Sequence, residues 1–151
     1  MPRLLTALAA ATALSLPGLA IAQDTDPNVA ARQGLMGLYA YNLGVLGGMA
    51  QGRMEYDADL AGEAATSLYH LSMAPTHRMW AEGTDNMSME GTRALPAIWD
   101  NMADFEAREA ALVAAAEAMS TAASTDLASL QGAMGGLGQA CGACHQTFRS
   151  Q

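Results

Sequence analysis

The stretch Cys141-Gly142-Ala143-Cys144-His145 lies near the C-terminus and contains the only two cysteines of the 151-residue chain. On a helix these two thiols and the imidazole share one face, because they are spaced by three and four positions. The same spacing continues along the whole C-terminal segment. Its apolar members are Leu127, Leu130, Met134, Leu137, Cys141, Cys144 and Phe148. Such a stripe predicts a bundle helix over 127–149 with both cysteines on its buried side.

Three more helices are predicted upstream. Asp26-Pro27 is a good helix start, since Asp caps the free amides and Pro suits the first helical position. Pro75 ends the second helix and Pro96 begins the third, and 76–95 is expected to be a long loop. The expected helices span 27–49, 58–73 or 60–73, 96–122 and 127–149. The sequence therefore predicts an all-α, antiparallel up-and-down four-helix bundle.

The spacing Cys-x-x-Cys-His is the motif that attaches a c-type haem, with two thioether bonds and a histidine ligand to iron. Zinc would need two more ligands, and only His70 and His77 remain, both of which we interpret as ordinary surface or boundary residues. Thiol–disulfide exchange usually accompanies a strand-helix-strand pattern, and no alternating strand pattern is evident. The sequence therefore predicts one covalent haem c enclosed by the bundle.

Residues 1–22 have the features of a cleavable signal peptide, with Arg3 before an apolar run and small residues at the expected cleavage site. We expect a mature domain of 23–151, exported to the periplasm. The apolar run at 4–16 is too short to span a bilayer, and no later run is longer, so we expect no membrane insertion.

The chain is acidic, with seven basic and fifteen acidic residues and a net charge of −8. Loss of Arg3 with the signal peptide makes the mature net charge −9. A strongly acidic protein is a poor partner for nucleic acid or anionic lipid. A basic redox protein remains a possible partner.

Arg32 lies on an apolar stripe of the first helix. Two interpretations are open. A buried guanidinium would need an anion, such as a haem propionate, in a charge-assisted pair. Alternatively, the side chain reaches solvent near the helix start.

The first helix also has a second apolar stripe, formed by Leu38, Tyr41, Val45 and Gly48-Met49. A helix that is apolar on two sides contacts two neighbours. One is its own bundle, and we expect the other to be a second copy of the chain. Gly44, Gly47 and Gly48 would allow close backbone approach, so the sequence predicts a homodimer through the first helix.

The chain resembles the class II c-type cytochromes, and cytochrome c′ most closely. The resemblance covers essentially the whole mature chain. It is carried by Arg32-Gln33-Gly34-Leu35-Met36, by Trp80 with Gly83-Thr84, by Pro96-Ala97-Ile98-Trp99, and by the motif at 141–145 with Phe148-Arg149. Its C-terminal haem motif distinguishes this class from class I, and the fold it implies is the four-helix bundle.

The resemblance implies a role for each site residue. Cys141 and Cys144 would form the thioethers and His145 would be the proximal iron ligand. Arg32 and Gln33 would lie near the propionates, Met36 over the distal haem face, and Arg149 close to the proximal imidazole. At Arg93 the family often has an acidic residue that meets the haem, so this position is a departure.

The resemblance also implies a function. We expect five-coordinate, high-spin iron that transfers electrons or binds small gases, NO and CO. The alternative is a six-coordinate, low-spin electron carrier with His145 and Met36 as the two ligands, since thioether sulfur suits iron. An enzyme is not expected, because no general acid–base pair can be placed beside the distal face.

Overall fold

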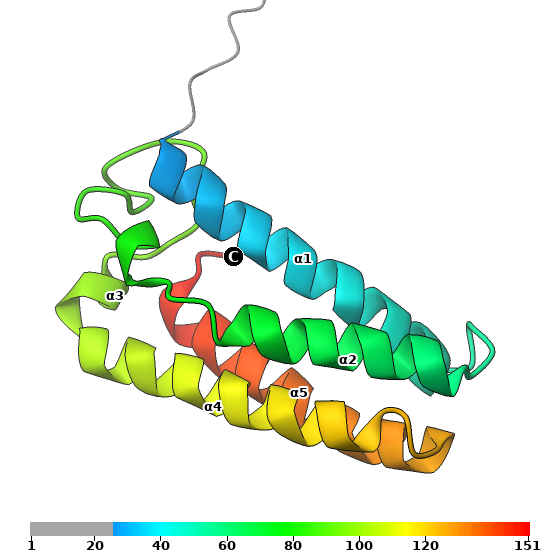
Figure 1. The fold of residues 1–151 in the computed structure, drawn as a ribbon. Helices are drawn as coiled ribbons and strands as arrows, with labels where there is room; N and C mark the ends of the chain where they lie inside the picture. Colours follow the sequence, from blue (N-terminus) through cyan, green and yellow to red (C-terminus); the bar gives the residue numbers. More distant parts are fainter. Residues whose placement is uncertain (1–25) are drawn as a thin grey trace, which may run out of the picture.

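A computed structural model describes residues 26–151. The signal peptide predicted for 1–22 lies outside the described residues. The described chain is all-helical, with four long helices and two short ones (Figure 1). They are α1 (Pro27–Ala50), α2 (Ala58–Ser72), the 3₁₀ turn η1 (His77–Met79), α3 (Ala97–Asp100), α4 (Met102–Ala122) and α5 (Leu127–Phe148).

Side-chain caps determine where the long helices begin. The carboxylate of Asp26 accepts hydrogen bonds from the amides of Asn28 and Val29 at the start of α1. Asp57 caps α2 and Asp126 caps α5 in the same way. These caps satisfy amides that have no partner within the helix, which is why the sequence placed these three starts within a residue or two.

One helix boundary differs from the prediction. A single helix was expected over 96–122, but the helix breaks at Asn101, which has a non-helical backbone with φ −143° and ψ 61°. Its side chain accepts a hydrogen bond from the amide of Asp104, 3.4 Å away. Asn competes with helical backbone by such local bonds, and it therefore caps α4 instead of continuing α3.

The four long helices form the predicted antiparallel up-and-down bundle. Helix α1 packs on α2 and α5, and α4 packs on α2 and α5 (Figure 1). Buried apolar side chains from all four helices form the main core. Across all the described residues, the largest fully buried side chains are Val29, Leu46, Met49, Leu68, Ile98, Met119, Leu130 and Leu137. The predicted stripe of α5 is thus confirmed as a core face.

The second apolar stripe predicted for α1 is partly exposed to solvent and partly buried in the core. Leu38 and Tyr41 are exposed, but Met49 is buried in the chain's own core. Gly48 is also buried, and a Cβ there would lie 2.7 Å from the sulfur of Met54. The expectation that Gly48-Met49 faces a second copy is therefore wrong, because the turn after α1 folds back over this end. Within 26–151, no helix combines the length and apolarity that a bilayer crossing requires.

Candidate haem-binding site

A cavity of about 440 Å³ lies at the end of the bundle where α1 begins and α5 ends. Its walls come from α1, α4, α5 and the segment between α2 and α4. Cys141, Cys144 and His145 all line it, together with Met36 from α1. The structure thus brings the complete motif and the expected distal methionine to one space. Most of the lining is apolar: Leu35, Met36, Tyr39, Ala40, Leu43, Met79, Trp80, Ala94, Ile98, Phe105, Leu112, Ala140 and Phe148.

An aromatic cluster closes one end of this cavity. The ring of Phe105 makes edge contacts with Trp80, at 4.7 Å between centroids, and with Phe148, at 5.3 Å. Cys144 packs against the buried residues of this cluster. Such edge-to-face contacts fix ring orientation as well as burying apolar area. The cluster therefore holds the last turn of α5, with its thiol, against α4.

The environment of the motif favours uncharged side chains. Burial raises the pKa of the Cys141 thiol, and burial together with the nearby carboxyl of Glu109 raises the pKa of Cys144 to about 11. Burial, then Arg149 and Arg93, lower the pKa of His145. A neutral imidazole is the form that binds a metal. His145 is therefore held in the protonation state that an iron ligand needs.

Arg32 is buried, with 4% of its surface exposed, so the interpretation in which it reaches solvent is wrong. Its Nη1 donates to the carbonyl of Met79 at 3.3 Å and to Thr84 Oγ1 at 2.8 Å. Its Nη2 donates to the carbonyl of Thr84 and to Thr92 Oγ1, the latter at 2.7 Å. The guanidinium also lies 4.9 Å over the Trp80 ring. Arg32 thus ties the long loop to α1 while lining the cavity.

Gln33 continues this arrangement on the solvent side. Its Nε2 donates to the carbonyl of Gly91 at 2.7 Å. Gly91 has φ +81°, a backbone conformation that glycine adopts without strain. Arg32 and Gln33 therefore both line the cavity and both hold the loop, a second task that the sequence alone did not reveal.

Arg93 and Arg149 lie together beside His145. The backbone of the loop pairs with the chain end, as Leu95 donates to the carbonyl of Phe148 at 3.0 Å. The side chain of Arg93 donates from Nε and Nη2 to the carbonyl of Ser150, at 3.1 and 2.7 Å. Both arginines line the cavity. The departure at Arg93 therefore adds a second positive charge near the imidazole.

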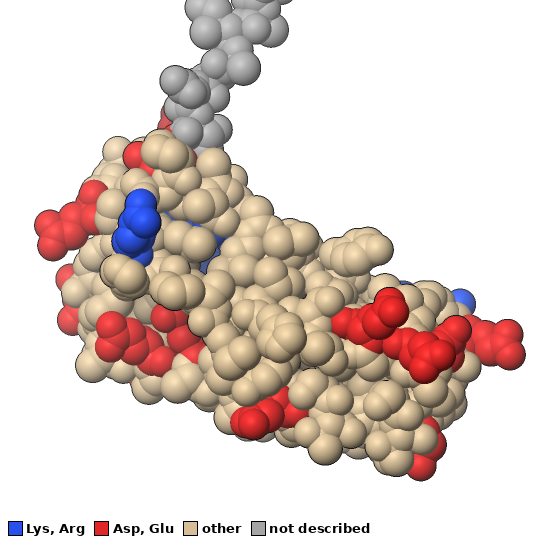
Figure 2. Space-filling model, viewed as in Figure 1, with Lys and Arg blue, Asp and Glu red and all other residues tan. Residues whose placement is uncertain are grey.

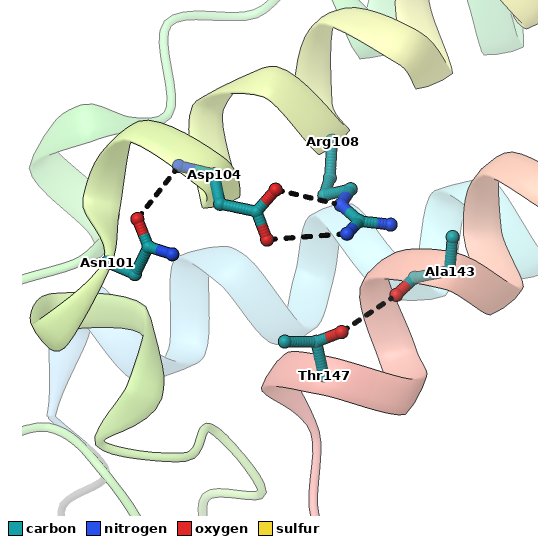
Figure 3. Close-up of polar contacts among 5 residues, drawn as sticks. All are labelled: Asn101, Asp104, Arg108, Ala143 and Thr147. Carbon is teal, nitrogen blue, oxygen red and sulfur yellow. Dashed lines mark hydrogen bonds and ion pairs between the residues drawn. The ribbon is translucent and has the colours of Figure 1, made fainter.

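A fourth arginine reaches the cavity from α4. Arg108 forms an ion pair with Asp104 one turn earlier, with its Nε 3.3 Å from the carboxylate. Figure 3 shows this pair between α4 and the last turns of α5, where the hydroxyl of Thr147 bonds the carbonyl of Ala143. Both side chains are about one third exposed, so the pair contributes little to stability. It orients Arg108 along the cavity rim.

Glu109 is a second cavity residue of α4, beside Arg108, that sequence reasoning missed. In the sequence it lies within the apolar spacing of the third helix, four residues after Phe105 and three before Leu112. Its side chain lines the cavity and accepts a hydrogen bond from Thr76 Oγ1 at 2.8 Å. The stripe itself contained the signal, because a carboxyl at a core position needs a local polar partner.

The cavity lining fits a haem. The buried Nε1–H of Trp80, on the cavity wall, has no hydrogen-bond partner, which is rare for a buried donor. Four arginines line a largely apolar space that also has two thiols and a neutral imidazole. A flat apolar ring with two carboxylates and a central metal matches each of these features. A helical bundle with such a cavity belongs to the class of four-helix c-type haem proteins.

Comparison with known proteins agrees with this class. A model of the family described as "Cytochrome C'" matches residues 27–149, and the chain belongs to this family. The chain is 43% identical over 139 residues to cytochrome c-554 of Cereibacter sphaeroides, covering 91% of each chain.

Solved structures share the fold. Cytochrome c′ from Rhodobacter spheriodes matches with a TM-score of 0.80 and 35% identity, over 82% of this chain and 95% of that chain. A variant of cytochrome c prime from Alcaligenes xylosoxidans, solved as a nitric oxide complex, matches with a TM-score of 0.70 and 30% identity, over 82% and 94% of the two chains. The family consists of non-enzymatic haem proteins, in agreement with the sequence-based prediction.

Proposed function

We propose that this protein is a monohaem c-type cytochrome, with thioether bonds to Cys141 and Cys144 and with His145 as the proximal iron ligand. The observation that carries the proposal is that all three side chains line one largely apolar cavity. The bound haem would supply a redox-active iron with an open axial position. The chain itself keeps His145 neutral, through burial and two neighbouring arginines.

Charged side chains support an orientation for the haem carboxylates. Arg32, Arg93 and Arg149 all line the cavity, and Gln33 lies beside them. We propose that the propionates face this group. The four terminal N–H bonds of Arg32 go to the loop, so its contribution is a fixed positive charge rather than a free donor.

We propose that the iron is five-coordinate and high-spin, with Met36 packed over its distal face. NO and CO would bind there, and the iron would also transfer electrons. The nitric oxide complex of a relative at 30% identity supports this reading. Met36 lines the cavity yet is 41% exposed, so its side chain has room to be displaced by a small ligand. The second candidate is a six-coordinate carrier in which the Met36 sulfur binds iron, and the presence of this sulfur at the cavity favours it.

The visible spectrum of the ferric protein separates these candidates. We expect a high-spin spectrum, and we expect Met36→Ala to raise CO affinity by opening the distal space. Met87→Ala is the matched control, because Met87 is 80% exposed and does not line the cavity. A far-red charge-transfer band that disappears in Met36→Ala alone would establish the six-coordinate candidate. A colourless protein, or a haem that acidified organic solvent extracts, would refute covalent attachment.

We propose that α1 mediates a homodimer. The helix has 24 residues and only one charged side chain, the buried Arg32. Leu38 and Tyr41 are 50% and 72% exposed. In Figure 2, acidic side chains gather where α1 joins α2, whereas the surface over the middle of α1 is uncharged. An uncharged apolar face of this kind favours association between copies.

Sedimentation tests the dimer. We expect a dimeric mass at micromolar concentration, reduced to a monomeric mass by Leu38→Glu, which places a charge on the proposed interface. Glu63→Gln on the exposed face of α2 is a control that should leave the mass unchanged. A monomeric wild type would contradict the proposal.

We also propose export to the periplasm by the signal peptide at 1–22, with a basic redox protein as a partner for the acidic surface. A purified mature protein should begin at Gln23, as measured by intact mass. A mass that includes residues 1–22 in an exporting host would contradict this proposal.

A further inference from the structure

Glu109 places a half-buried carboxyl in the haem cavity. It accepts a hydrogen bond from Thr76 Oγ1 at 2.8 Å. The side chain of Trp80 also lowers the pKa of this carboxyl, although its buried N–H makes no hydrogen bond of ordinary geometry. In the described part of the chain, the one ion pair joins Arg108 to Asp104 rather than to Glu109. The charge of Glu109 is therefore stabilised by the one hydrogen bond from Thr76 and has no cation in direct contact.

Groups from several elements surround this carboxyl. Burial is the main cause that raises the pKa of Glu109, and the negative charge of Glu106 raises it further, whereas Thr76 and Trp80 lower it. The titratable, charged and polar groups on the elements around it are Glu106 and Arg108 of α4, Tyr39 of α1, Ser72 of α2, Thr76 and Trp80 of the loop, and Cys141, Cys144 and His145 of α5.

Most of these neighbours are not available to exchange a proton near neutral pH. Thioether formation removes the two thiols, and iron ligation occupies His145. The pKa of Tyr39 is raised to about 12, mainly by burial, so this phenol stays protonated. Arg108 forms its ion pair with Asp104. Among the side chains that line the cavity, Glu109 is thus the one carboxyl, and its pKa is raised above the ordinary value, mainly by burial.

A charge in a largely apolar cavity interacts strongly with any other charge there. Ferric haem carries one more positive charge than ferrous haem, so reduction removes a charge that favours the Glu109 carboxylate. We propose that Glu109 is a proton-binding site that takes up one proton when haem in this cavity accepts one electron. A one-electron donor supplies the electron to iron, and solvent supplies the proton to a Glu109 carboxylate oxygen. The net charge of the cavity is then unchanged, and oxidation reverses both transfers. This inference rests on the proposed haem-binding function.

The reduction potential as a function of pH tests the proposal. For the haem-loaded wild type, we expect the reduction potential to fall by about 59 mV per pH unit, which is a tenfold fall in the ratio of reduced to oxidised protein at fixed potential. This fall should occur over a pH window that begins above the ordinary glutamate pKa of 4.5. Glu109→Gln should abolish the slope in this window. Glu106→Gln is the matched control, since it removes an exposed charge on the same helix and should keep the slope.

Two further measurements keep the proposal falsifiable. Thr76→Val removes the bond that stabilises the carboxylate, so it should move the window to higher pH without removing the slope. Infrared difference spectra should show a protonated carboxyl appearing on reduction of the wild type and absent in Glu109→Gln. A red Glu109→Gln protein with an unchanged slope would overturn the inference alone, because a group other than Glu109 would then take up the proton. A colourless wild type would overturn the proposed function and this inference together.

Discussion

Replacing Arg32 provides a direct test of how the long loop is held over the cavity. Arg32→Met removes four hydrogen bonds from the guanidinium to the loop. The side chain is 4% exposed, and Thr84, which supplies two of the acceptors, is 5% exposed, so water does not readily replace the lost donors. An unsatisfied buried acceptor costs about 1–3 kcal/mol, and bonds to a charged donor lie at the upper end of the range for hydrogen bonds.

The four acceptors lie close together, so their contributions do not simply add. We expect Arg32→Met to lower the free energy of unfolding by about 3–5 kcal/mol, a large part of the stability of about 5–15 kcal/mol usual for a domain. Arg32→Lys keeps the charge but loses the planar fork, so we expect an intermediate loss of about 1–3 kcal/mol.

Urea unfolding of the haem-loaded proteins, followed by circular dichroism, measures these differences. Gln33→Ala is the control, because Gln33 makes one exposed bond to the same loop and should cost less than about 1 kcal/mol. Hydrogen exchange at the Thr84 amide should accelerate in Arg32→Met but not in Gln33→Ala. Equal losses for Arg32→Met and Gln33→Ala would refute the conclusion that the buried guanidinium anchors the loop.

Two further substitutions probe the core and its pH dependence. Leu137→Ala, at a fully buried position of α5, should lower the free energy of unfolding by about 2–5 kcal/mol in urea, and a loss below about 1 kcal/mol would contradict its placement in the core. Burial raises the pKa of Tyr39 to about 12 from an ordinary 10.0. The folded state therefore gains stability by keeping the Tyr39 phenol protonated. This gain is full below pH 10 and is lost as the pH rises toward 12. Tyr39→Phe should lose less stability than the wild type between pH 9 and 11, and equal losses in both proteins would argue against a buried phenol.

The α5 helix shows how far local patterns reach. Its apolar residues recur at helical spacing and Asp126 caps its first turn, so both its span and its buried face were predicted correctly. The motif at 141–145 is equally local, because neighbouring residues on one helix turn must share a face. The two cysteines and His145 could therefore be assigned to one cavity wall before any tertiary contact was known.

The break at Asn101 shows why a boundary inside an otherwise helical pattern is harder to predict. Apolar spacing continues across it, from Ile98 to Phe105, and these two residues join the same small core cluster. The cap at Asn101 competes with helix continuation by a small free-energy difference. Packing of α3 against α4 and α5 decides that competition, and such packing is not visible in a local window.

The apolar periodicity and the helix caps were sufficient to predict the helices, the bundle and the placement of the motif on α5. Each of these depends on residues within a few turns of one another. The partners of Arg32 and Glu109 could not be obtained in this way. Arg32 contacts a loop some fifty residues later along the chain, and Glu109 contacts Thr76 more than thirty residues earlier. Whether a charged side chain on an apolar stripe reaches water, a cofactor or another segment depends on what the folded chain brings beside it, and only three-dimensional packing makes that choice.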